Sequence, residues 1–66
     1  MNEEELRKRL EERGWKLRKV VRFKRHDRIV AERPGITVTY YLRKKLDDFS
    51  WDELQHLFKP VKGASN

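Results

Sequence analysis

The segment from residue 15 to residue 24 alternates apolar and basic side chains, which is the period of a β-strand with one face in a core. The apolar positions on its inner face are Trp15, Leu17, Val21 and Phe23. The positions on its outer face are Lys16, Arg18, Val20, Arg22 and Lys24. The pattern therefore predicts a strand that builds a core with one side and presents cations on the other.

A short polar loop after this strand predicts a first hairpin. Arg25-His26-Asp27 reads as a three-residue loop, with the aspartate in the left-handed position that such a turn favours. This loop length sets Phe23 opposite Ile29. It also sets Val21 opposite Ala31, so that four apolar side chains share the inner face.

Pro34-Gly35 predicts a second hairpin. A Pro-Gly type II turn suits a two-residue hairpin poorly, so we expect a four-residue loop from Arg33 to Ile36. The resulting register sets Ala31 opposite Val38 and Ile29 opposite Tyr40. The sequence thus predicts a three-stranded antiparallel meander over residues 15–24, 28–33 and 36–42.

Helix signals flank the predicted strands on both sides. Asn2 is a good N-cap for a first helix, which Gly14 ends. Ser50-Trp51-Asp52-Glu53 has the pattern of a capping box, and Pro60 stops the second helix. Each helix has one apolar stripe, so both must cover the single apolar face of the sheet. We therefore expect an α+β fold of order α-β-β-β-α, as one domain over residues 1–60 with a flexible tail over 61–66.

Composition and charge distribution limit the classes of protein to which this chain can belong. The chain has 66 residues, no cysteine and a net charge of +6. Residues 13 to 28 alone carry a charge of +7, whereas residues 1 to 12 and 46 to 66 are each at −2. The absence of cysteine and of a long apolar run predicts a cytoplasmic protein with no membrane role. A basic stripe on one element is typical of phosphate binding.

The predicted outer face supplies a candidate nucleic-acid site. Tyr41 lies opposite Arg28 in the expected register, where it could form a cation–π pair or stack on a base. The candidate binding residues are Lys16, Arg18, Arg22, Lys24, Arg25, Arg28, Tyr41, Arg43, Lys44 and Lys45. Two distant histidines and scattered carboxylates match no ligand spacing, so no metal site and no cofactor are expected. Trp15 and Trp51 are expected to anchor the core.

Several short motifs are similar to those of the HicA (YcfA-like) toxins, a family of small mRNA-cleaving proteins with a double-stranded-RNA-binding-domain (dsRBD-like) fold. The resemblance spans residues 1 to 58. Its motifs are a first helix ending in Gly14-Trp15, the basic strand from Lys16-Leu17, His26 before the second strand, Ile36-Thr37-Val38, Lys45-Leu46, and leucines 54 and 57.

The resemblance implies that His26 is catalytic, that RNA is the substrate and that an antitoxin-like protein covers the site. Metal-free RNA cleavage needs a base for the 2′-hydroxyl proton, a role that suits histidine, and cations for the phosphorane charge. The alternative for His26 is a surface turn residue without a catalytic role. His56 is expected to be solvent-exposed. The alternative function is a non-catalytic interaction protein, such as a small phage or plasmid regulator or inhibitor. Its basic sheet face would bind DNA or an acidic protein partner.

Overall fold

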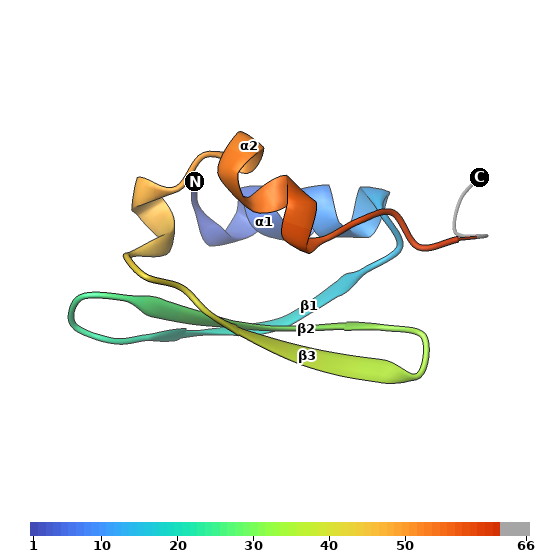
Figure 1. Ribbon diagram of the computed structural model, residues 1–66, viewed down its shortest axis with the longest axis horizontal. Helices are drawn as coiled ribbons and strands as arrows, with labels where there is room; N and C mark the ends of the chain where they lie inside the picture. Colours follow the sequence, from blue (N-terminus) through green and yellow to red (C-terminus); the bar gives the residue numbers. More distant parts are fainter. Residues whose placement is uncertain (63–66) are drawn as a thin grey trace.

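The computed structural model describes residues 1–62 and shows a three-stranded antiparallel sheet with helices on one face (Figure 1). The strand order is β1-β2-β3. The elements are α1 (Glu3–Glu12), β1 (Lys16–Arg22), β2 (Asp27–Arg33), β3 (Ile36–Tyr41), the 3-10 turn η1 (Leu46–Asp48), α2 (Trp51–Leu54) and the 3-10 turn η2 (Gln55–Leu57). The predicted α+β meander with a helix at each end is confirmed.

Helix α1 begins and ends where the sequence predicts. The Asn2 side chain accepts a hydrogen bond of 2.7 Å from the Glu5 amide, which satisfies one of the free N–H groups of the first turn. Gly14 follows the helix with a φ of 86°, a left-handed conformation that glycine adopts without strain. Leu6 and Leu10 are fully buried and fix the helix on the sheet.

Helix α2 is shorter than predicted. Ser50 and Glu53 form the expected capping box, in which each side chain accepts from the other residue's amide. The α-helix lasts only from Trp51 to Leu54 and tightens into η2 before Pro60. The linker before it also forms the 3-10 turn η1.

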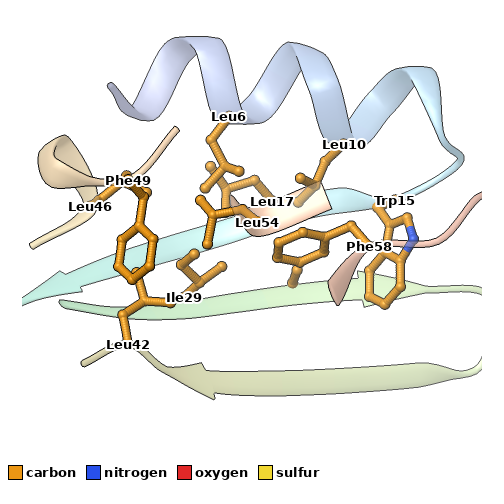
Figure 2. Packing of buried hydrophobic residues seen from close by; sticks show 11 residues of the cluster. Leu6, Leu10, Trp15, Leu17, Ile29, Leu42, Leu46, Phe49, Leu54 and Phe58 are labelled. Carbon is orange, nitrogen blue, oxygen red and sulfur yellow. The ribbon is translucent and has the colours of Figure 1, made fainter. Parts of the chain in front are cut away.

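The core lies between the helices and the inner face of the sheet (Figure 2). Phe58 is fully buried and makes T-shaped contacts with two rings, at centroid distances of 5.3 Å to Trp15 and 5.1 Å to Tyr40. The Trp15 indole N–H donates to the Lys59 carbonyl at 2.8 Å, so its polar atom is satisfied. The buried apolar residues are Leu6, Leu10, Trp15, Leu17, Ile29, Ala31, Leu42, Leu46, Phe49, Leu54 and Phe58.

The predicted register between β1 and β2 is wrong. The structure pairs Leu17 with Ala31 and then Lys19 with Val30, so Arg18 is an extra residue in a β-bulge. Because a one-residue shift exchanges the two faces of a strand, every residue of β1 after the bulge changes side. Val20 packs against the core, whereas Val21 faces outward opposite Arg28.

The first hairpin turn also differs from the prediction, because Ile29 pairs with Val20 and not with Phe23. Arg22 pairs with Asp27 as the last step of the ladder, and the Phe23 amide donates to the His26 carbonyl at 3.0 Å inside the turn. Phe23, predicted to be in the core, is 40% exposed. Asp27, predicted as a turn residue, is instead the first residue of β2 and fully buried.

The second hairpin has the predicted register but a tighter turn. Ile29 lies opposite Tyr40 and Ala31 opposite Val38, as expected. The ladder continues to a pair between Arg33 and Ile36, so Pro34-Gly35 forms a two-residue turn and not the four-residue loop. Gly35 has a φ of 81°, which allows this turn.

The chain remains attached to the domain beyond residue 60. The Val61 amide donates to the Arg13 carbonyl at 2.8 Å, and the Val61 side chain packs against the core. The end of the predicted tail, residues 63–66, lies outside the described residues.

Candidate nucleic-acid interface

The outer face of the sheet is not covered by any helix of residues 1–62 (Figure 1). Four of its residues belong to the predicted binding set, namely Lys16, Arg18, Arg28 and Tyr41. Arg18 forms an ion pair of 3.0 Å with Glu32, the acidic residue of this face. Lys16 is exposed and makes no ion pair within the described residues. The face therefore has an excess of positive charge.

Lys19 is a binding candidate that the sequence reading missed. It lies opposite Val30 on the outer face, directly after the bulge, and is exposed without an ion pair in the described part of the chain. Strict alternation after Arg18 would have turned its side chain toward the core. No pattern in the sequence predicts the bulge, so only the structure shows that Lys19 lies on the outer face.

Three aromatic rings and one guanidinium group lie close together at the end of the sheet nearest the first hairpin. The Arg28 guanidinium carbon lies 5.6 Å from the Phe23 ring centroid and 5.5 Å from that of Tyr41. The His26 ring stacks on Phe23 at 4.8 Å with an interplanar angle of 14°. We call these four residues the aromatic row. The expected cation–π pair between Arg28 and Tyr41 is thus present, and two further rings extend it.

His26 is held in place mainly by Phe23. Its carbonyl accepts from the Phe23 amide, and its ring is stacked on the Phe23 side chain. Within residues 1–62 no carboxylate hydrogen-bonds its imidazole. The carboxylate of Asp27, the next residue in the chain, has other partners. Lys24 and Arg25, in the same turn, are exposed and form no ion pair with the described residues.

Two of the residues predicted to bind phosphate instead donate hydrogen bonds to the buried Asp27 carboxylate. Arg22 donates to it at 2.8 Å and Lys45 at 2.7 Å, and the Leu46 amide donates a third bond of 2.7 Å. Arg22 also lies 3.6 Å from Glu3 of α1, so its side chain is on the helix side of the sheet. Its predicted place on the outer face is therefore wrong, because the bulge has turned it inward.

These contacts determine the charge state of Asp27. Burial alone would raise the pKa of this carboxyl, but the hydrogen bonds from Lys45, Leu46 and Arg22 outweigh burial and hold the pKa below its ordinary value. The carboxylate thus stays ionised inside the fold and pairs with both Arg22 and Lys45.

Arg43 and Lys44 converge on Glu53 at the start of α2. Their side-chain nitrogens lie 3.7 and 3.6 Å from the same carboxylate oxygen, and both cations also lie over the Phe49 ring. The Ser50 amide lowers the pKa of Glu53, and the charges of Lys44 and Arg43 act in the same direction against partial desolvation. Both cations are therefore partly neutralised.

The remaining aromatic and histidine residues have structural or solvent-exposed positions. Trp51 is partly buried at the rim of the core, where the guanidinium groups of Arg9 and Arg13 lie 5.6 and 5.1 Å from its ring centroid. His56 is exposed, as expected. Residues 1–62 contain no group of three His, Asp or Glu side chains able to hold a metal ion, and no helix among them is long and apolar enough to cross a membrane.

Comparison of the chain with protein-family models, with curated proteins and with solved structures gives no significant match.

Proposed function

We propose that this protein is a small RNA-binding domain that binds its ligand on the outer face of the sheet and on the β1–β2 turn. The observation that supports this best is the distribution of unpaired cations. On this face and turn, Lys16, Lys19, Lys24 and Arg25 are exposed without ion pairs among the described residues. Cations free of acidic partners are available to displace counterions from a phosphate backbone.

Apart from Glu32, the acidic residues occur elsewhere in the fold. Asp27 is buried, and Glu32 is neutralised by Arg18. The other acids belong to α1, η1 and α2, on the opposite side of the sheet (Figure 1). A polyanion approaching the outer face would therefore meet little repulsion, which favours association through electrostatic steering.

The resemblance to HicA-type toxins supports RNA as the anion and suggests cleavage through His26. The α-β-β-β pattern of the chain fits that family's dsRBD-like fold. His26 would accept the 2′-hydroxyl proton as the 2′-oxygen attacks the adjacent phosphorus, and Arg25 and Lys24 would stabilise the charge on the phosphorane. The P–O5′ bond then breaks, and the leaving 5′-oxygen takes a proton from water. The stacked Phe23 ring would hold the imidazole in place, as no carboxylate of the described residues does so.

Binding is tested by the salt dependence of affinity for a labelled RNA. We expect log affinity to fall linearly with log salt, and a Lys24→Ala/Arg25→Ala variant to lower the slope by about 0.7 for each phosphate contact that it loses. The matched control is Arg7→Ala/Lys8→Ala, which removes two exposed cations from α1 without touching the outer face. Equal losses in the two variants would contradict a site at the turn.

Cleavage is tested separately with His26→Ala, with His56→Ala as the control histidine. If His26 is catalytic, RNA cleavage measured at saturating protein is lost in the first variant and kept in the second. Cleavage by His26→Ala at the parent rate would remove the catalytic part of the proposal and leave RNA binding intact.

A second function is favoured by the exposure of large apolar groups on the same face. Tyr41 is 71% exposed and Phe23 40%, and both flank Arg28. Aromatic and arginine side chains are enriched at protein interfaces. The alternative proposal is thus a regulator or inhibitor that binds DNA or an acidic protein partner. Failure of RNA to bind at low salt, together with a DNA complex or a defined acidic partner, would favour it.

A further inference from the structure

We propose that the aromatic row of Phe23, His26, Arg28 and Tyr41 is a stacking platform for unpaired bases, so that the ligand is a single-stranded segment of RNA. This inference rests on the proposed RNA-binding function and adds the class of RNA. It starts from the arrangement of the row, in which the Phe23 ring of the β1–β2 turn and the Tyr41 ring of β3 lie beside the Arg28 guanidinium of β2, and the His26 ring stacks on Phe23.

The exposure of the row is the first argument. A tyrosine ring normally places much of its apolar surface in a core or an interface, yet Tyr41 is 71% exposed and Phe23 is 40% exposed. Neither belongs to the core cluster, which lies on the other side of the sheet. Both rings therefore retain surface on which a planar ligand can stack.

The state of Arg28 is the second argument. Its guanidinium lies over two rings and forms no ion pair with any described residue, and its Nε is buried without a hydrogen-bond partner. The charge of Arg28 is thus held at the platform by aromatic contacts and is not neutralised by an acid. A cation at this position suits a phosphate that follows a stacked base.

The cations around the row complete a site for a strand. Lys24 and Arg25 stand beside it in the turn, and Lys19 lies on the same face. Proteins that bind single strands combine a basic surface with exposed aromatic side chains, because each base offers a π face once it is unpaired. The bases of a duplex are stacked on each other and cannot use such a platform. The charge complementarity and the rings together select a single strand.

The test compares two forms of one RNA. A labelled single strand of mixed sequence and the same strand annealed into a blunt duplex are titrated at one low salt concentration with the parent, Tyr41→Ala, Tyr41→Phe and Ile36→Ala. Ile36 is the matched control, because it is a large apolar residue of β3 with 44% exposure that lies outside the row.

We expect the parent to bind the single strand more tightly than the duplex. Tyr41→Ala should weaken single-strand binding at least about fivefold with an unchanged salt slope, since stacking contributes no phosphate contact. Tyr41→Phe keeps the ring and should bind like the parent, as should Ile36→Ala.

Three results would overturn the inference. Equal affinity for strand and duplex, or equal effects of Tyr41→Ala and Ile36→Ala, would remove the stacking platform while leaving RNA binding in place. Tighter binding of a DNA strand with the same base sequence would overturn the assignment to RNA. Absence of binding to every RNA at low salt would instead contradict the proposed function itself.

Discussion

Asp27 is the residue whose environment departs most from its sequence context. It stands in a run of basic turn residues, yet its side chain is fully buried and accepts from Arg22, Lys45 and the Leu46 amide. Its carbonyl also accepts from the Leu42 amide at 3.0 Å. One residue thus joins the end of β1, the start of β2 and the linker that leads to η1.

We expect Asp27→Asn to lower the free energy of unfolding by about 2 to 3 kcal/mol at neutral pH, because it leaves two cations without their buried partner. Urea denaturation followed by tryptophan fluorescence measures this. Asp48→Asn makes the same chemical change at an exposed carboxylate and should have little effect.

The same pair of variants gives the pH dependence. Because the folded pKa of Asp27 lies below its ordinary value of 3.8, its contribution to stability is complete above that pH and declines as the pH falls toward the folded pKa. The difference in stability between the parent and Asp27→Asn should therefore shrink in acid. A difference that is constant down to pH 2 would contradict the role assigned to this carboxylate.

At the scale of elements, the sequence predicts the helix caps and turns that depend on residues close together in the chain. The Asn2 cap, the Ser50 capping box, Gly14 and the register of β2 with β3 are all confirmed. The register of β1 with β2 could not be predicted, because it depends on distant partners. Lys45 and Leu46 bind Asp27 across the fold, and the bulge at Arg18 places Arg22 where it can do the same.

The bulge can be tested with two neighbouring valines. Val20→Ala should destabilise the fold by about 1 kcal/mol, because this side chain packs against the core, whereas Val21→Ala should cost less than about 0.5 kcal/mol. Both substitutions change the strand propensity equally, so their difference in urea midpoint reports which side chain faces inward. The regular alternation seen in the sequence requires the opposite order.

At the scale of the molecule, the sheet layer carries most of the basic residues and the helix layer carries most of the acidic ones. Residues 13 to 45, which hold the sheet and its connections, carry twelve of the seventeen Lys and Arg side chains and only two acids. This asymmetry could be predicted from the sequence, and with it the basic face. The residues of the candidate site could not all be predicted. Arg22 and Lys45 bind the buried Asp27 carboxylate, whereas Lys19 and Phe23, which are not among the predicted binding residues, are exposed on the outer side.

The extra residue in β1 allows Leu17 and Val20, which are three residues apart, to face the core from the same strand. Removing Arg18 would make Leu17, Lys19 and Val20 consecutive residues of a regular strand, so that Val20 and Arg22 would stay on the helix side and Phe23 on the outer face. A single-residue deletion there should therefore remove the bulge and leave the same side chains on each face of the strand.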